Sequence, residues 1–423
     1  MYQVLNPAEL LQERREPAAE DGTRSRGRMR VVFLLGLTSL FTDISSEMVV
    51  AILPLYLVAV GGFSPLAFGV IDGLYNGATA ILMLASGYIG DRWKKHKEVA
   101  TAGYGISAVC KLLLAIAGTA LSSIGAIVLL DRAGKGIRTA PRDAMISLSV
   151  PRERLGVAFG LHRALDTTGA MLGPLVAFLI LAVAPLAFGT IFVVSFFIAL
   201  IGLGILVLLV QPRRAVPDAA DPAPAPSLRG ATGLLKDRRY RMVLIAGVVL
   251  SLATASDAFV FLALEDSVDL GSTLFPLLFV GSASTFMLLA IPMGRIADRY
   301  GRGRVLLGGY ALLFCVYAVL LLPIGGWPLV ALALALLGGY YAATDGVLMA
   351  LGATVVPEEL RGSGLALLRT ATSIARMIAS LTFGALWTLG GIDLAIACFG
   401  AGLIVATLLA AVVLHRTPEP AHG

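Results

Sequence analysis

The sequence Gly87-Tyr88-Ile89-Gly90-Asp91-Arg92-Trp93-Lys94-Lys95-His96-Lys97 is a short charged stretch between two long apolar segments. A second stretch of the same form occurs in the C-terminal half of the chain: Gly294-Arg295-Ile296-Ala297-Asp298-Arg299-Tyr300-Gly301-Arg302-Gly303-Arg304. The first stretch has its glycine and Asp-Arg pair at Gly87, Asp91 and Arg92, and the second at Gly294, Asp298 and Arg299. Two matching charged turns, each between hydrophobic segments, predict a membrane protein built from two similar halves.

The composition supports a membrane protein. Hydrophobic residues make up 57% of the 423 residues and charged residues 14%, whereas ordinary soluble domains contain about 25% charged residues. A soluble fold could not bury so much apolar surface, but a polytopic membrane protein is solvated by lipid. The net charge is +6, and basic residues gather in short turns between apolar segments, which is typical of membrane topology and not of nucleic-acid binding.

Apolar segments of about 20 residues, the length that crosses a bilayer, occur along most of the chain. They lie near residues 31–59, 64–89, 99–121, 123–148, 155–182, 186–210, 242–264, 272–294, 305–323, 327–350, 363–389 and 394–414. We therefore predict an all-α polytopic membrane protein with 12 transmembrane helices in two pseudo-symmetric six-helix halves, 31–210 and 242–414. Such a parallel repeat places a substrate site between the halves, near the middle of the membrane.

The remaining segments are predicted to be cytoplasmic. Residues 1–30 and 415–423 form two tails, and residues 211–241 form a linker rich in proline and basic residues. Lys and Arg occur in the turns after the even-numbered spans and are absent from the turns between an odd-numbered span and the next. By the positive-inside rule, both termini lie in the cytoplasm of a multi-pass protein of the cell inner (plasma) membrane.

The two charged stretches resemble the signature loop of the major facilitator superfamily, Gly-x-x-x-Asp-Arg-x-Gly-Arg-Arg/Lys. The second copy fits this loop through Gly301 and Arg302, whereas the first has Lys94 where glycine is usual. Arg132 and Gly136 are similar to a second motif of that family. The resemblance implies a secondary transporter, which we expect to be a monomer. It also implies that the loops form a cytoplasmic gate, in which we expect Asp91 and Arg92 to meet Arg142 and Asp143.

Another motif lies in the fifth span. Gly169, Gly173 and Pro174 are similar to the Gly-x-x-x-Gly-Pro motif associated with proton-driven exporters of that family, although Ala177 and Phe178 replace its last two glycines. A Gly-x-x-x-Gly spacing alone also packs helices together. The resemblance therefore favours export coupled to protons, and the residues by themselves favour helix packing.

Many charges lie inside the predicted spans of the N-terminal half. They are Asp43, Glu47, Asp72, Asp131, Arg132, Lys135, Arg138, His162, Arg163 and Asp166. At roughly 3 kcal/mol per charge, the four charges between residues 131 and 138 would cost about 12 kcal/mol if they faced lipid. They must therefore face a wet cavity or one another, and both a structural and a functional interpretation stay open.

Asp43 and Glu47 are the candidates for proton coupling. They lie one helical turn apart, and two neighbouring carboxylates in a poorly solvated site cannot both be ionised cheaply. Asp72 lies near the predicted outer mouth. His162 and Asp166 share a helix face and fit either a proton relay or an ion pair.

The C-terminal half has fewer charges inside its spans: Asp257, Asp345, Arg369 and Arg376. Arg369 and Arg376 are two turns apart on one face. They suit either an anionic or zwitterionic substrate or the neutralisation of the acids in the first span.

The sequence contains no P-loop, dinucleotide fingerprint or metalloprotease motif in the required context, and Cys110, Cys315 and Cys398 have no metal-type spacing. We therefore expect no enzyme activity, metal or cofactor. The expected partners are a small-molecule substrate, protons and membrane lipid. The favoured function is proton-coupled efflux of a small amphipathic compound by alternating access. The alternatives are a proton symporter that imports a metabolite or organic anion, and a membrane sensor that transports nothing.

Overall fold

The computed structural model describes residues 18–77, 95–118, 120–151, 154–211, 233–323, 325–357 and 360–415. The N-terminal half contains α2 (Ala18–Leu55), the π-helix η1 (Tyr56–Val60), helical residues 65–77, α4 (His96–Ile116), α5 (Leu121–Ser149), α6 (Leu155–Val183), α7 (Phe188–Gly204) and the π-helix η3 (Ile205–Leu209). The C-terminal half contains α9 (Arg238–Leu252), α10 (Asp257–Val268), α11 (Gly271–Leu274), α12 (Pro276–Tyr300), α13 (Arg302–Leu320), α14 (Trp327–Thr344), α15 (Val347–Val355) and α16 (Arg361–His415).

Helices occur at every predicted span. In the part of the chain that the structure describes, nine helices are long and apolar enough to cross a membrane. One of them, α16, is two helices joined at Gly390 and Gly391, where the backbone leaves the helical conformation. The charged helix α5 and helical residues 65–77 occupy the two other spans. The prediction of an all-α polytopic membrane protein is confirmed, and the second of the twelve spans is described only as far as residue 77.

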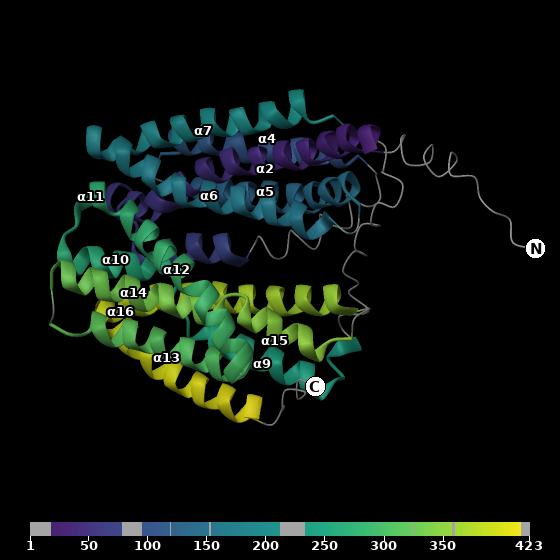
Figure 1. The fold of residues 1–423 in the computed structure, drawn as a ribbon. Helices are drawn as coiled ribbons and strands as arrows, with labels where there is room; N and C mark the ends of the chain where they lie inside the picture. Colours follow the sequence, from purple (N-terminus) through teal and green to yellow (C-terminus); the bar gives the residue numbers. More distant parts are fainter. Residues whose placement is uncertain are drawn as a thin grey trace, which may run out of the picture.

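The helices form two groups that lie side by side (Figure 1). In one group α2 packs against α6 and α7, and α4 packs against α5 and α7. In the other, α9 packs against α16, and α14 packs against α12 and α13. The first group lies within residues 18–211 and the second within residues 233–415. Residues 18–30 of the predicted N-terminal tail belong to α2, whereas most of the predicted linker lies outside the described residues.

Glycine allows α6 to approach α2 closely. A Cβ atom on Gly169 would lie 2.4 Å from the carbonyl oxygen of Leu40, and one on Gly173 would lie 2.8 Å from the Cβ atom of Glu47. The Gly-x-x-x-Gly spacing therefore brings the two helix backbones together. This contact fixes α6 beside the part of α2 that carries the acids.

The halves touch each other at one end of the molecule, which we call the sealed end. There the backbone N–H of Leu66 donates to the Thr388 hydroxyl over 2.9 Å, and the Thr273 hydroxyl donates to the carbonyl oxygen of Leu181 over 3.4 Å. A Cβ atom on Gly384 would lie 2.4 Å from the carbonyl oxygen of Pro65. Helical residues 65–77 and α16 therefore form a close seam between the halves.

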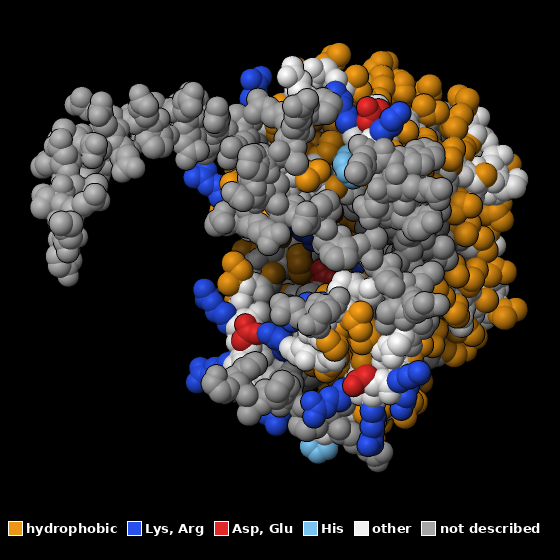
Figure 2. All heavy atoms as spheres, turned by 90° about the vertical axis from the view of Figure 1, so that its right-hand side faces the viewer, with side chains coloured by type: hydrophobic (Ala, Val, Ile, Leu, Met, Phe, Trp, Pro, Cys, Tyr) orange, Lys and Arg blue, Asp and Glu red, His pale blue; other side chains and the backbone are white. Residues whose placement is uncertain are grey.

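The opposite end, which we call the open end, is different. Figure 2 looks at this face, where Lys and Arg side chains gather, and shows a hollow between the two halves. If the basic face is cytoplasmic, as the positive-inside rule predicts, the cavity between the halves opens inward.

Two spans of the C-terminal half are interrupted. Between α9 and α10, the Tyr317 hydroxyl accepts a hydrogen bond from the Ala255 N–H over 2.8 Å and donates to the Ala253 carbonyl over 3.3 Å. Between α14 and α15 the chain turns at Asp345 and at Gly346, which has a φ of 79°. Backbone polar groups that leave a helix inside a membrane need such partners. Each interruption lies beside an acid, Asp257 or Asp345.

Candidate functional site

A cavity of about 420 Å³ lies between the two halves. Its polar lining consists of Asp43, Glu47, Lys135, Arg163, Asp166, Thr167, Asp257, Ser282, Tyr341 and Asp345. Its apolar wall comes mainly from α6 and α12 and includes Met171, Pro174, Phe279, Phe286 and Met287. Acids outnumber bases in this lining, and aromatic and Met side chains cover the rest. The cavity therefore suits a molecule with both an apolar body and polar groups.

The side chains of Asp43 and Asp166 line the same cavity and act on each other. An ionised carboxylate can only accept hydrogen bonds, so a hydrogen bond between the two groups requires a proton on one of them. Asp43 is only 9% exposed, and Lys135 and Arg138 are the positive charges that act on it. The two acids form a site that can hold or release one proton beside a buried positive charge.

Glu47 lies in the same cavity but has different neighbours. Its charge acts on Lys135 and on Arg132. The sequence predicts that Glu47 is the acid neighbour of Asp43, whereas the structure brings Asp43 to Asp166 of α6. Glu47 instead acts electrostatically on two cations of α5.

Asp131 belongs to a buried ion cluster between α4 and α5. It pairs with Lys111 and with Arg132 and accepts a hydrogen bond from the Ser107 hydroxyl over 2.6 Å. The guanidinium of Arg132 also lies 3.9 Å from the ring centroid of Tyr75. These pairs support a structural role for Asp131, which lines neither of the cavities described here.

A second polar network joins α2, α5 and α6 toward the open end. Arg142 pairs with Asp143 over 2.9 Å and donates to the Ser39 hydroxyl over 3.3 Å. The Ser39 hydroxyl also bonds His162 Nε2 over 3.0 Å. Arg138 lies over the Tyr104 ring at 4.7 Å. These contacts stay within the N-terminal half and bind its helices to one another.

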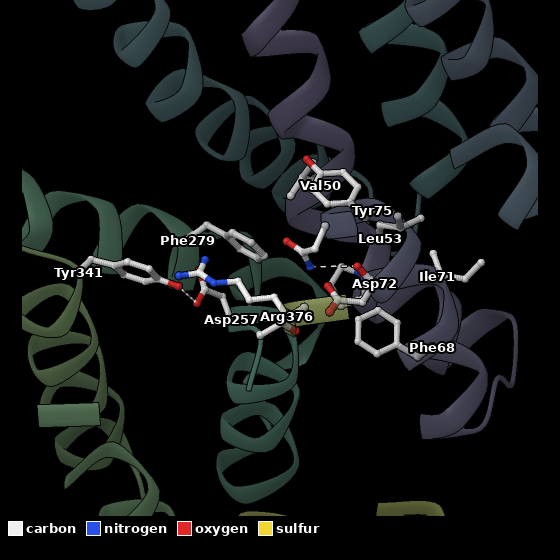
Figure 3. Close-up of a pocket in the computed structure, with 14 residues that line it drawn as sticks. Val50, Leu53, Phe68, Ile71, Asp72, Tyr75, Asp257, Phe279, Tyr341 and Arg376 are labelled. Atoms are coloured by element: carbon white, nitrogen blue, oxygen red, sulfur yellow. Dashed lines mark hydrogen bonds between the residues drawn. The ribbon is translucent and has the colours of Figure 1, made fainter. Parts of the chain in front are cut away.

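A smaller cavity of about 170 Å³ lies next to the large one, toward the sealed end (Figure 3). Three residues, Asp257, Phe279 and Tyr341, line both cavities. In the small one the Tyr341 hydroxyl donates to the carboxylate of Asp257, and Arg376 of α16 acts on the same carboxylate. Asp72 enters from helical residues 65–77 and accepts a hydrogen bond from the Ser380 hydroxyl of α16. This bond joins the two halves.

Other predicted residues lie outside these cavities or at their margin. Arg369 is exposed and lines neither cavity, so only Arg376 of the predicted arginine pair reaches a pocket. The Arg163 side chain is 79% exposed and lies 4.0 Å from Asp166 at the margin of the large cavity.

Of the predicted cytoplasmic gate, the structure describes the second charged loop and the gate residues of α5. Gly87, Asp91 and Arg92 lie outside the described residues. In the second loop Asp298 pairs with Arg302 over 3.2 Å, and Arg299 lies 5.5 Å from the ring centroid of Tyr300. A Cβ atom on Gly294 would meet nothing within 4 Å. These contacts are local to the loop.

Sequence reasoning missed several site residues. Lys111 is the one charge in the middle of the third predicted span, and this isolation was a usable signal for a buried ion pair. Tyr75, Tyr341 and Ser380 lie in largely apolar stretches and give no comparable signal. Among the residues that the structure describes, no group of three or more His, Cys, Asp or Glu side chains is arranged to hold a metal ion.

Comparison with known proteins places the chain among transporters. A sequence model of the Major Facilitator Superfamily matches residues 35–287 and 258–423. An uncharacterised MFS-type transporter of Methanocaldococcus jannaschii is 33% identical over 370 residues, which cover 84% of this chain and 88% of that protein. The crystal structure of a point mutant of the nucleoside transporter NupG shares the fold with a TM-score of 0.75 and 15% identity, covering 92% of this chain and all of that one. A POT family transporter in complex with a conjugated peptide has a TM-score of 0.74 and 13% identity, covering 92% and 96%.

Proposed function

Because the chain belongs to the major facilitator superfamily, and is therefore a multi-pass membrane transporter of small molecules, we propose that it exports a small amphipathic compound in exchange for protons. The observation that carries this proposal is the contact between the Asp43 and Asp166 carboxyl groups in the wall of the large cavity. A shared proton at this position lies where a substrate would bind. Proton and substrate can therefore influence each other directly.

The exchange follows from alternating access. When the cavity opens to the outside, a proton binds the Asp43 and Asp166 pair and substrate leaves. When the cavity opens inward, the proton leaves through the open end, and the nearby Lys135 compensates the second negative charge. Substrate then binds in the cavity. Coupling requires that the proton and the substrate stabilise different states of the transporter.

The rest of the fold supports the two states. The sealed end would separate when the cavity opens outward. The first charged loop would then meet α5 at the cytoplasmic end, with Asp91 and Arg92 in contact with Arg142 and Asp143. The second loop, with Asp298 and Arg299, would act as its partner in the gate. In this proposal the transporter works as a monomer in the cell inner membrane, with both termini in the cytoplasm.

Transport into everted membrane vesicles tests the direction and the coupling. Vesicles with an acidic lumen expose the cytoplasmic face to the medium, and a proton-coupled exporter accumulates substrate in the lumen as protons leave it. A panel of amphipathic compounds identifies the cargo. Asp43→Asn and Asp166→Asn should each abolish the response to the pH gradient, while Asp393→Asn, an exposed carboxylate elsewhere on α16, should leave it unchanged.

Import by proton symport is the second candidate, because Lys135 and Arg376 could hold an anionic group of a substrate. A symporter in the same vesicles would move substrate out of the acidic lumen together with protons. Net movement in that direction would overturn export. A protein that binds compounds of the panel without any flux would instead be a sensor.

A further inference from the structure

The small cavity between the halves has a chemical character of its own. Its volume of about 170 Å³ is close to that of an engineered cavity of about 150 Å³ that binds benzene. Aromatic rings of Phe68, Tyr75, Phe279 and Tyr341 line it, and their side chains surround the two acids in Figure 3. It can therefore hold one ring-sized group together with a small polar group.

The two acids of this cavity differ in their partners. Asp257 accepts a hydrogen bond from the Tyr341 hydroxyl and interacts electrostatically with Arg376. Asp72 accepts a hydrogen bond from the Ser380 hydroxyl, and the charged neighbour that acts on it is a second acid, Asp257. Among the described residues that line the cavity, Arg376 is the only base. One negative charge therefore lacks a counter-ion.

An uncompensated carboxylate in a poorly solvated site is unfavourable unless a proton or another cation neutralises it. An anionic ligand would meet two acids, whereas a cationic ligand would complete the charge balance. The aromatic walls favour the same choice, because ring faces attract ammonium groups. One of these rings, that of Tyr75, already carries the Arg132 guanidinium at 3.9 Å, so stacking of a cation on an aromatic ring occurs at this wall.

We propose that the small cavity binds the protonated amine of the transported substrate, with Asp72 as its counter-ion and the aromatic side chains around its ring or alkyl group. This inference rests on the proposed transport function, because it treats the ligand as the cargo. Asp257, Phe279 and Tyr341 face both cavities, so the rest of the substrate extends into the large cavity. The transported proton and the amine are thus held by different acids.

The position of Asp72 gives this contact a second consequence. The Ser380 hydroxyl that donates to Asp72 belongs to the C-terminal half. A Cβ atom on Gly69, one turn before Asp72, would lie 2.6 Å from the Ser380 carbonyl oxygen. Opening of the sealed end pulls Ser380 away from Asp72 and exposes the amine to the outside. Binding at Asp72 and opening of the seam therefore involve the same residues.

Equilibrium binding to the full-length chain in lipid nanodiscs, without a pH gradient, tests this inference. The probes are 2-phenylethylamine, its neutral counterpart 2-phenylethanol and its anionic counterpart 3-phenylpropionate. We expect the amine to bind about tenfold or more tightly than either counterpart, because a charge-assisted hydrogen bond is lost in both. Asp72→Asn should remove this preference, and Asp393→Asn should preserve it.

A second measurement uses the unaltered protein and so does not depend on folding of a variant. Carbodiimide labels accessible carboxyl groups, and mass spectrometry locates the label. The amine should protect Asp72 from labelling, and the alcohol should not. Equal binding of amine and carboxylate, a preference that survives Asp72→Asn, an absence of amine binding, or equal protection by amine and alcohol would each overturn the inference.

These outcomes are separable from those of the transport experiment. Binding of the amine through Asp72 without proton-driven flux would retain the site and overturn proton-coupled export. Proton-driven export of neutral or anionic compounds, with no binding of the amine, would retain the transport function and overturn the amine site.

Discussion

The two halves of this transporter carry their polar groups in different ways. In the N-terminal half, continuous helices carry many charges, and α5 alone contains Asp131, Arg132, Lys135, Arg138, Arg142 and Asp143. In the C-terminal half the spans hold few charges, but two of them are interrupted, between α9 and α10 and between α14 and α15. One half therefore places many charged side chains inside the membrane, and the other places non-helical backbone there.

This difference indicates that the two halves have different roles in transport. Asp131 pairs with Lys111 of the neighbouring α4 and with Arg132 of its own helix, and we infer that the N-terminal half is a rigid electrostatic frame for the proton site. Interrupted helices can bend at their breaks without losing many backbone hydrogen bonds. We expect the C-terminal half to supply most of the movement around the substrate, and the predictions below test this contrast.

The largest expected effect comes from breaking the ion cluster of the N-terminal half. Lys111→Met leaves the buried carboxylate of Asp131 with one cation in place of two, and removal of one partner from a buried ion pair costs about 3–5 kcal/mol. The variant should show a large drop in thermal stability, which size-exclusion chromatography after heating measures. Lys97→Met, which alters a partly exposed lysine that donates to the Val207 carbonyl, is the matched control and should have little effect.

A smaller effect is expected where helices approach through glycine. Gly173→Ala places a methyl group 2.8 Å from the Cβ atom of Glu47, and overpacking of this kind costs about 1–3 kcal/mol. Gly160→Ala lies on the same helix where a Cβ atom meets nothing within 4 Å, and it should be neutral. Equal thermal stability of the two variants would show that α6 does not depend on close contact with α2.

A glycine-to-alanine substitution in the seam between helical residues 65–77 and α16 should change the balance between the inward-open and outward-open states. Gly384→Ala meets the Pro65 carbonyl oxygen at 2.4 Å, and this contact exists only while the sealed end is closed. The variant should populate the outward-open state more often than the natural protein. Distances between spin labels on the two halves measure this shift, and Gly402→Ala, which meets nothing within 4 Å, should leave them unchanged.

The smallest effect is expected at an interruption of the C-terminal half. Tyr317→Phe removes the hydroxyl that bonds both Ala253 and Ala255, and unsatisfied buried groups cost about 1–3 kcal/mol each. Because the bent segment can recruit other partners, we expect the stability loss to fall near the lower end of this range. A loss as large as that of Lys111→Met would contradict the proposed contrast between a rigid and an adaptable half.

The sequence predicts the spans well because lipid imposes one strong rule: backbone groups inside the membrane must bond within their own helix. The twelve apolar stretches and the match between the two charged loops follow from that rule and from the duplication. The interruptions were not predicted, because Ala253 and Gly346 lie within apolar stretches that fit a continuous helix. The hydroxyl that supports the first break comes from Tyr317, more than sixty residues away.

Some of the residues that line the large cavity could be anticipated from the sequence, but the way they pair could not. Spacing along one helix indicates that Asp43 and Glu47 share a face, and both line the large cavity. It could not show that Asp43 meets Asp166, because that contact depends on how α6 packs against α2 through Gly169 and Gly173. The two arginines of α16 share a helix face, yet only Arg376 reaches a cavity, because two helical turns separate their positions by about 10 Å.

The most direct test concerns the proton between Asp43 and Asp166. Infrared spectroscopy of the purified protein detects the carbonyl stretch of a protonated carboxyl group, which is distinct from that of an ionised carboxylate. At neutral pH the natural protein should show a protonated-carboxyl band that is lost in Asp43→Asn and retained in Asp393→Asn. A spectrum of Asp43→Asn that retains the same band would contradict the assignment of the transported proton to this pair.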